Sequence, residues 1–360
     1  MSRVTCWLHT RQFPQDGGVF WLESGWDWWH TQRGPAGRAG LEADKMRALY
    51  IKEYGGPEVM QIGELPDPEP KRGEVLVAIK ASSINPVDWK VRSGELKFIT
   101  GRAFPKTLGS DFAGVMERVG AGVTAPSVGD RVYGITALML RKPGAQAERL
   151  VAPSKRLRRM PDSMSFELAA ALPVAGLTAL NGLRQCGDLR GKAVLINGAT
   201  GGVGHFAVQI AKARGATVTA VCSERNAERA RTLGADAVID YRKQDFTRGS
   251  VHYDVVFDVF GHLKFPAVAP VLKDRGAMVT TLPGPSLVAR MVWRRLLGGK
   301  HVVLGSMRDR PEDYAELERL LADGSVKPVI DKIVPLAEAA QAYTALEAGG
   351  TVGKVVIRIA

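Results

Sequence analysis

Cysteine is scarce in this chain of 360 residues, which contains only Cys6, Cys186 and Cys222. No two of them are closely spaced, so the sequence offers neither a disulfide framework nor a four-cysteine zinc lobe. We therefore expect a protein of a reducing compartment, and we assign it to the cytoplasm.

Long apolar runs are missing as well. No stretch approaches the roughly 18 uninterrupted apolar residues of a membrane-spanning helix, and the first residues lack the apolar centre of a signal peptide. With 45% hydrophobic and 24% charged residues, the composition is that of a globular protein with about two domains. We expect a soluble protein.

Acidic residues are fewer than basic ones. The chain has 37 Asp and Glu and 49 Lys and Arg, which gives a formal net charge of +12. Such an excess draws a protein toward nucleic acid, an anionic membrane surface or phosphorylated ligands. No helix-turn-helix or zinc-finger pattern accompanies the charge, so we expect no specific nucleic-acid partner and assign part of the charge to a dinucleotide. The basic segment 286–300 leaves a weak association with a membrane surface or RNA open, although packing in the core or in a homodimer explains its apolar residues more simply. We expect a homodimer.

The chain divides into segments of different pattern. Residues 1–45 hold five of the seven tryptophans and no sustained period, so they are either a poorly ordered extension or follow an upstream start that is not used. Residues 46–170 show short β-type runs between Gly and Pro turns, whereas residues 171–309 alternate strands and helices, which predicts a parallel doubly wound sheet. Residues 310–360 end in a strand that we assign back to the first domain. The β-rich domain and the doubly wound parallel sheet together make the fold class α/β.

The most specific signal is a glycine-rich turn between a buried strand and an amphipathic helix. The pattern Ala199-x-Gly201-x-x-Gly204 is that of a dinucleotide-binding turn. Small residues allow a tight turn, a close approach of backbone N–H groups to pyrophosphate, and close packing of helix and strand. The candidate cofactor contacts in this turn are Ala199, Thr200, Gly201, Gly202, Val203 and Gly204.

The end of the next strand predicts which nicotinamide cofactor is used. An enzyme that prefers NAD commonly has Asp or Glu here against the ribose hydroxyls. In this chain Ser223 stands at that position, and Arg225 and Asn226 follow, which together can hold the 2′-phosphate of NADPH. Glu224 lies between them, either as a ribose contact or because a helix start favours an acidic residue. We expect NADPH.

These segments together resemble the medium-chain dehydrogenase/reductase superfamily and, within it, the zinc-independent quinone oxidoreductase branch that includes zeta-crystallin and the plant enone oxidoreductases. The resemblance runs from Met46 to Ala360. It implies a GroES-like β-rich catalytic domain, a Rossmann domain and an active site in the cleft between them. The segments that carry it include VLVAIKASSINPVDWKVRSG, TLGSDFAGVMERVGAGV, NGATGGVGHFAVQIAK and the terminal VGKVVI.

Zinc-dependent members of that superfamily carry a Cys ligand in the segment that matches Ser82–Asp88 and a His-Glu pair after the glycine that matches Gly109. This chain has Asn85 in the first segment and Ser110 and Asp111 in the second. Without a cluster of soft ligands, we expect neither a catalytic nor a structural zinc ion.

The resemblance also places three side chains at the reacting centre. Asn85 and Lys90 of NPVDWK would lie beside nicotinamide and substrate, with Lys90 contacting a ribose and relaying a proton, and Tyr54 would lie at the mouth of the cleft. Simpler explanations stay open: a turn stabilised by Asn85 before Pro86, a solvated Lys90, and a Tyr54 that only packs. Relatives of the zeta-crystallin type often carry Tyr where Lys90 stands, which leaves the substrate preference open.

Further cofactor contacts follow from the resemblance alone. They are Thr178 near the phosphates, Tyr241 beside the adenosine phosphate, Phe260 and Gly261 near the nicotinamide, and Leu282 with Gly284 after the following strand. Of the neighbouring residues with reactive side chains, His205 is interpreted as a helix-opening residue and Cys222 as a buried strand end.

Without a metal ion, hydride transfer needs a close approach to an electrophilic carbon and donors for the charge that develops on the carbonyl oxygen. Conjugated carbonyl compounds already spread that charge, so we expect an NADPH-dependent reductase of quinones or α,β-unsaturated carbonyl compounds. Two alternatives stay open: a reductase of aldehydes or enoyl thioesters, and a non-enzymatic NADPH-binding protein that associates with a membrane or RNA.

Overall fold

The computed structural model describes residues 44–136, 138, 142–282 and 299–359. The interpretation of residues 1–45 as an extension therefore concerns a segment that lies almost wholly outside the described residues. Gly284 and most of the basic segment 286–300 lie outside them too. Among the described residues, no helix is long and apolar enough to cross a membrane.

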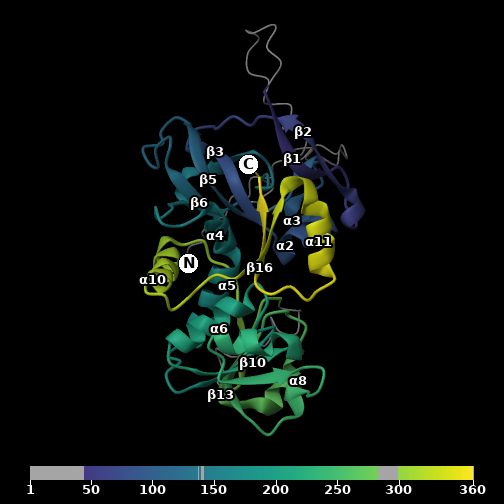
Figure 1. The fold of residues 1–360 in the computed structure, drawn as a ribbon, viewed down its shortest axis with the longest axis vertical. Coiled ribbons are helices and arrows are strands. Elements are labelled where there is room, and N and C mark those ends of the chain that lie inside the picture. The colour runs from purple at the N-terminus through teal and green to yellow at the C-terminus, as the bar shows by residue number, and fades with distance from the viewer. Residues whose placement is uncertain (1–43, 137, 139–141, 283–298, 360) are drawn as a thin grey trace, which may run out of the picture. The chain divides into compact units, whose positions relative to one another are not determined.

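The first domain is built on two sheets. A three-stranded antiparallel sheet has the order β2–β1–β4, and a seven-stranded sheet has the order β15–β16–β3–β5–β6–β8, with β7 paired to β3 (Figure 1). The strand β16 at the end of the chain pairs with β3, more than 250 positions earlier. The strands are β1 (Lys45–Ile51), β2 (Met60–Pro66), β3 (Glu74–Ser83), β4 (Lys106–Thr107), β5 (Asp111–Val119), β6 (Arg131–Ile135), β7 (Arg149–Pro153), β8 (Leu157–Arg159), β15 (Ile330–Pro335) and β16 (Lys354–Arg358).

Short helices join these strands. The helix α2 follows β3 directly and begins with a proline, whose missing N–H costs nothing in the first turn. The α-helices of this part of the chain are α2 (Pro86–Arg92), α3 (Lys97–Thr100), α4 (Phe166–Ala171) and α11 (Ala339–Glu347).

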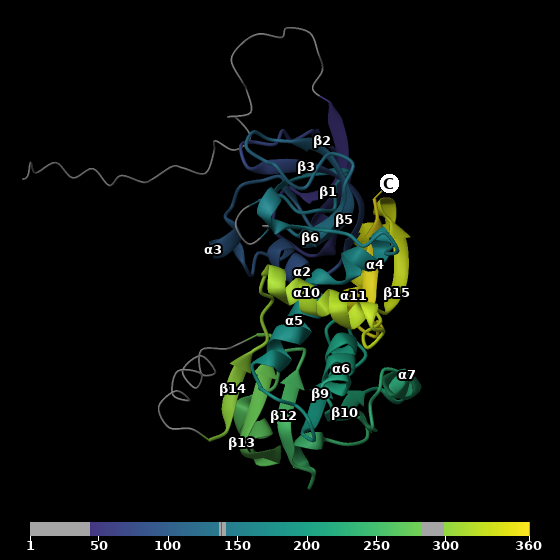
Figure 2. The same cartoon turned by 90° about the vertical axis from the view of Figure 1, so that its left-hand side faces the viewer.

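The second domain is a six-stranded parallel sheet with the order β11–β10–β9–β12–β13–β14 (Figure 2). Its first strand lies in the middle, and the chain builds outward on one side before it crosses to the other. The carboxyl ends of β9 and β12 therefore flank the switch point, where doubly wound sheets bind ligands. The strands are β9 (Ala193–Asn197), β10 (Thr217–Cys222), β11 (Ala237–Asp240), β12 (Tyr253–Asp258), β13 (Leu272–Thr280) and β14 (His301–Leu304).

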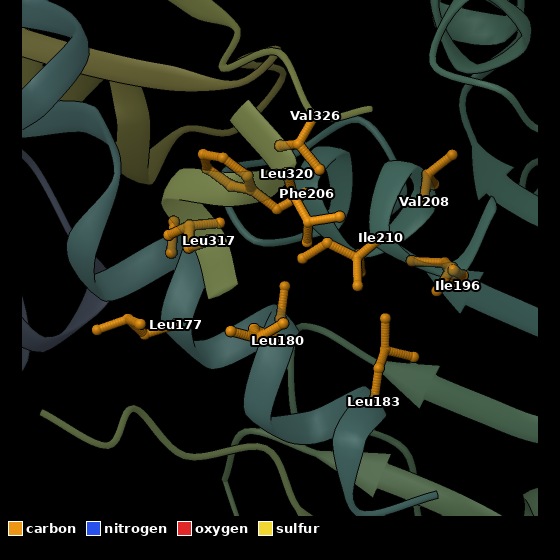
Figure 3. Packing of buried hydrophobic residues seen from close by; sticks show 14 of the residues in the cluster. Leu177, Leu180, Leu183, Ile196, Phe206, Val208, Ile210, Leu317, Leu320 and Val326 are labelled. Carbon is orange, nitrogen blue, oxygen red and sulfur yellow. The ribbon is translucent and has the colours of Figure 1, made fainter. Parts of the chain in front are cut away.

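Helices α5 (Pro173–Arg184), α6 (Gly204–Ala213) and α10 (Pro311–Ala322) form a common core with this sheet (Figure 3). On α5 the buried leucines recur every three residues, so they share one face. Gly176 allows α10 to approach closely, because a Cβ there would lie 2.7 Å from Leu317 Cδ2. Burial of each such leucine contributes roughly 1.5–3 kcal/mol. The core residues labelled in the figure are Leu177, Leu180, Leu183, Ile196, Phe206, Val208, Ile210, Leu317, Leu320 and Val326. The other α-helices that the structure describes in this domain are α7 (Ala227–Thr232) and α8 (Phe265–Val268).

Candidate active site

The glycine-rich turn lies at the switch point of the parallel sheet. Its first residue, Gly198, has a φ of +86°, a conformation that glycine adopts without strain. The N–H groups of Gly198 and Ala199 both donate to the Val221 carbonyl over 3.1 Å, which ties the turn to β10. A Cβ on Gly204 would lie 1.9 Å from the Gly198 carbonyl oxygen, so helix and turn pack as the motif requires. The sequence pattern assigned the tight turn to Ala199. The residue with the left-handed conformation is Gly198, one position earlier.

The remaining turn residues form a cradle of the kind that fits a pyrophosphate. A Cβ on Gly201 would contact only the Gly198 carbonyl oxygen, at 3.4 Å, so the space over this residue is open. The helix α6 begins directly afterwards and has ten residues, and its positive N-terminal end favours an anion. The segment thus fits the phosphates of a dinucleotide.

The residues predicted to select the cofactor lie at the end of β10. Ser223 is buried, and the Asn226 Nδ2 donates to the hydroxyl of Thr200 in the turn over 3.3 Å. Arg225 is exposed and its Nη2 donates to the Gly350 carbonyl over 3.2 Å. Glu224 points to another partner, because its Oε2 lies 2.5 Å from the Lys243 ammonium.

The predicted nicotinamide contacts meet beside the same turn. The Phe260 ring lies against Gly198, since a Cβ there would be 2.7 Å from it. Gly261, with a φ of +71°, packs against Leu282. Asp258 at the end of β12 orders this loop, because its carboxylate accepts from the Asn197 side chain at 3.0 Å and from a backbone N–H of the loop at 2.8 Å.

Two further predicted contacts lie on other elements, Thr178 in α5 and Tyr241 directly after β11. The Thr178 hydroxyl donates within its own helix, to the Val174 carbonyl over 2.6 Å, so it stays free to accept one bond. Tyr241 is 56% exposed, and its backbone N–H donates to the Cys222 carbonyl at the end of β10. Cys222 itself is buried at that strand end, as the sequence indicated.

On the side of the first domain, Asn85 is the centre of a buried polar network. Its Oδ1 accepts from the Lys354 ammonium over 2.6 Å, and its Nδ2 donates to Asp111 Oδ2 over 2.8 Å. The same carboxylate accepts from the Ser83 hydroxyl at 2.7 Å and, through Oδ1, from the Val174 N–H at 2.9 Å. Asn85 is thus held by side chains distant in the sequence and does more than stabilise a turn before Pro86.

Asp88 adds a second carboxyl group to this network. It accepts from the Asn85 N–H at 2.8 Å and from the Ser110 hydroxyl at 2.6 Å. Burial raises the pKa of Asp88 to about 7, against the lowering effect of these two hydrogen bonds. The carboxyl group therefore changes its protonation state near neutral pH.

Lys90 and Tyr54 lie on the outer part of the same region. Lys90 is half-buried in α2, and burial lowers the pKa of its ammonium while Glu95 raises it. No hydrogen bond or ion pair to its Nζ occurs within the described part of the chain. The Tyr54 hydroxyl donates to the Gly101 carbonyl, and its ring packs edge-on against Phe104 with centroids 5.0 Å apart. The Tyr54 side chain is therefore engaged in packing. The Lys90 ammonium is available to contact a ligand.

The start of β16 connects this network to the glycine turn. The Gly353 N–H donates to the Thr200 carbonyl over 2.8 Å, and the Lys354 N–H donates to the Val329 carbonyl over 2.8 Å. The Val329 N–H in turn donates to His205 Nε2 at 3.1 Å, while His205 Nδ1 bonds the carbonyl of Gly201 at 2.9 Å. Burial lowers the pKa of His205 to about 4, so the imidazole is a neutral structural bridge.

Two residues of this arrangement were missed as functional candidates. Lys354 stands in the VGKVVI segment and Asp111 in the segment TLGSDF. Both segments carry the resemblance, but a lysine and an aspartate at the starts of two strands give no local signal of a buried pair. A charged residue inside an apolar run is the cue that could have singled out Lys354.

A zinc ion does not fit the residues that face this network. The positions expected for ligands hold Asn85, Ser110 and Asp111, and the Lys354 ammonium lies 3.7 Å from Asp111 Oδ2. A fixed positive charge at that distance opposes a dication. Over the described ranges, no group of three or more His, Cys, Asp or Glu side chains is arranged to hold a metal.

The sheet order, the glycine turn at the switch point and the attached β-rich domain define a two-domain protein of GroES-like and Rossmann architecture. Comparison with known proteins places it more narrowly. The family described as "Alcohol dehydrogenase GroES-like domain" matches residues 71–162, and the one described as "Zinc-binding dehydrogenase" matches residues 233–357. The chain belongs to the medium-chain dehydrogenase/reductase family of oxidoreductases.

Similar proteins include several plant and bacterial reductases. The chloroplast envelope quinone oxidoreductase homologue of Arabidopsis thaliana is 34% identical over 87% of this chain and 98% of its own length. The chloroplastic NADPH-dependent alkenal/one oxidoreductase of the same plant is also 34% identical, over 87% of this chain and 79% of its own. The solved quinone oxidoreductase from Coxiella burnetii has a TM-score of 0.80 and 31% identity, and the match covers 88% of this chain and 100% of that one.

Proposed function

We propose that this protein is an NADPH-dependent reductase of quinones or α,β-unsaturated carbonyl compounds that works without a metal ion. The observation that carries the proposal is the direct attachment of the glycine turn to the buried network of Asn85. Gly353 donates to Thr200 of the turn, and the next residue, Lys354, donates to Asn85. The quinone and alkenal/one oxidoreductases among the relatives support the substrate class.

The preference for NADPH rests on the residues at the end of β10. Glu224 is paired with Lys243, so it is not held toward the turn as an acidic residue that binds a ribose would be. Asn226 contacts Thr200 of the turn, and Arg225 is exposed beside it with one carbonyl partner. A guanidinium and an amide in these places suit a 2′-phosphate.

Independence from metal rests on the chemistry of the Asn85 network. The positions expected for ligands hold the amide of Asn85, the hydroxyl of Ser110 and the carboxylate of Asp111, which already faces an ammonium, and these form a poor donor set for zinc. The charge that develops on a substrate carbonyl must then be stabilised by hydrogen-bond donors of the protein.

Each candidate residue has a role in that chemistry. When bound, the nicotinamide supplies a hydride to the electrophilic carbon of the substrate. The Asn85 Nδ2 has a second hydrogen, which can donate to the carbonyl oxygen of the substrate. Lys90 holds a proton on its Nζ, and its lowered pKa makes that proton easier to transfer to the reduced substrate. The Phe260 ring lies against Gly198 of the turn.

A substrate panel tests this function. Purified protein is assayed with NADPH and with NADH against a benzoquinone, a short-chain enone, a saturated aldehyde and an enoyl thioester, and oxidation of the cofactor is followed at each concentration. We expect the highest kcat/KM with NADPH and a quinone or enone. A clear preference for the aldehyde or the thioester would overturn the substrate class, and tight NADPH binding without turnover of any acceptor would support a non-enzymatic role.

A further inference from the structure

Lys354 is a charged side chain in the interior of the protein. Its side chain is 3% exposed, and its Nζ donates to Asn85 Oδ1 at 2.6 Å and to the Ile84 carbonyl at 3.0 Å. The counter-charge is Asp111, whose Oδ2 lies 3.7 Å away and whose side chain is fully buried. Transfer of both charges from water is costly, so a buried pair of this kind is weak evidence of a stabilising role.

The pair fixes the orientation of the Asn85 amide. An ammonium can only donate hydrogen bonds and a carboxylate can only accept them. The oxygen of Asn85 must therefore face Lys354, and its nitrogen must face Asp111. If Lys354 were replaced by a side chain that cannot donate, only Asp111 would still hold the amide, and the amide could turn about that single contact. The direction of the remaining Nδ2 hydrogen thus depends on Lys354.

The same lysine lies against the dinucleotide turn. A Cβ on Gly202 would lie 3.4 Å from Lys354 Cδ and 3.6 Å from the Gly353 carbonyl oxygen. The aliphatic part of the side chain therefore passes the turn, while its charged end binds Asn85. One residue sets the position of the amide relative to the place where a cofactor would bind.

We propose that Lys354 is a positioning residue, an internal cation that stands among the positions expected for metal ligands and, with Asp111, orients the Asn85 amide toward the substrate carbonyl. This inference rests on the proposed function for its catalytic consequence. Its structural part, the fixed Asn85 amide, is independent of which substrate is reduced.

Four variants separate positioning from stability. Lys354→Met keeps the length of the aliphatic side chain and removes the charge, and Asp111→Asn removes the opposite charge. The double variant contains both changes, and Lys332→Met, an exposed lysine on the neighbouring strand β15, is the matched control. For each variant we would measure the melting temperature, the Kd for NADPH, and kcat and KM with the best substrate of the panel.

We expect Lys354→Met to lower the melting temperature by roughly 5–10 °C, because Asp111 is left as a buried unpaired charge. The double variant should regain most of that loss. Turnover should fall about 10-fold or more in Lys354→Met and should stay low in the double variant, while the Kd for NADPH changes by less than about 3-fold. Recovery of kcat together with the melting temperature would show a purely structural role and overturn the proposal.

The Asn85 amide can also be observed directly. The chain contains only four asparagines, Asn85, Asn181, Asn197 and Asn226, so 15N-asparagine labelling gives a spectrum with few side-chain signals. An Asn85→Ala variant assigns the Asn85 pair. Lys354→Met should shift this pair and leave the signals of Asn181 unchanged, whereas an unmoved Asn85 pair would contradict the inference. This result holds even for a protein that reduces no substrate of the panel, so failure of the proposed function and failure of the inference are distinguishable.

Discussion

Glu224 forms an ion pair with Lys243, with 2.5 Å between the carboxylate oxygen and the ammonium. Both side chains are about two-thirds exposed, so the pair itself adds little stability. Its consequence is the direction of the Glu224 side chain, which points toward Lys243 in the segment after β11. The groups left near the turn are Arg225 and Asn226.

Arg225→Ala should raise the KM for NADPH about 10-fold or more and leave that for NADH nearly unchanged. A charge-assisted hydrogen bond to phosphate contributes about 1.5–3 kcal/mol. NADH has no 2′-phosphate and does not make this bond. Steady-state kinetics with both cofactors checks this, with Arg229→Ala, an exposed arginine on the following helix α7, as the control. An equal loss for both cofactors would remove the assignment.

Two buried groups should give opposite pH dependences of stability. The pKa of Asp88 is raised from 3.8 to about 7, so the stability it contributes is present below pH 3.8 and is lost as the pH rises toward 7. The pKa of His205 is lowered from 6.5 to about 4, so its contribution is present above pH 6.5 and is lost as the pH falls toward 4. Between about pH 4 and 6.5 the two effects offset each other.

Substitution of Asp88 or His205 should reveal the pH dependence of stability that the other residue contributes. In Asp88→Asn the melting temperature should rise from pH 4 to 6.5 more steeply than in the parent protein, and in His205→Gln it should fall over the same interval. Thermal unfolding at half-unit steps of pH measures these slopes, which are compared rather than the absolute stabilities because each change also alters hydrogen bonds. Three parallel curves would mean that neither group titrates in this interval.

Lys90→Ala should lower kcat with an enone about 10-fold, roughly 1.4 kcal/mol of transition-state stabilisation, while NADPH binding changes less. A quinone should be less affected, since its reduced oxygen is an aromatic phenolate that needs a donor less than an enolate does. Turnover numbers for both substrates, with Lys97→Ala as the control, test this. If the variant equals the parent protein on both, Lys90 is a surface residue and the proton comes from elsewhere.

Activity should survive prolonged treatment with a chelator, and elemental analysis should find well below one zinc ion per chain. The reason is the Lys354 ammonium beside Asp111, which occupies the region where a dication would need its ligands. Stoichiometric zinc together with turnover that is lost on chelation would contradict the metal-free mechanism.

The fold class could be predicted from the sequence because it depends on two patterns of residues that are close together in the chain. The alternation of apolar strands and amphipathic helices indicated the parallel sheet, and the glycines marked the turn. The strand β15 and the start of β13 were not predicted. β15 has only partly buried or exposed residues, and the first half of β13, Leu272–Arg275, is largely polar, so neither shows an apolar period. Gly198 was overlooked because the motif was counted from Ala199.

The Asn85 network could not be predicted from local pattern. Lys354 lies 269 positions from Asn85, and only the pairing of β16 with β3 brings them together. Nothing in the neighbourhood of either residue specifies the other. The roles of Lys90, Tyr54 and the cofactor contacts came from the resemblance, and they stay predictions until variants are measured.

The most direct test of the account follows the transferred hydrogen. The protein is incubated with NADPH that carries deuterium at the reactive C4 position and with a short-chain enone, and the product is analysed by mass spectrometry and NMR. The account predicts a saturated ketone with one deuterium on the β-carbon and a proton from solvent on the α-carbon. An allylic alcohol with deuterium on the former carbonyl carbon would contradict it, because that product identifies an alcohol dehydrogenase that acts on the carbonyl itself.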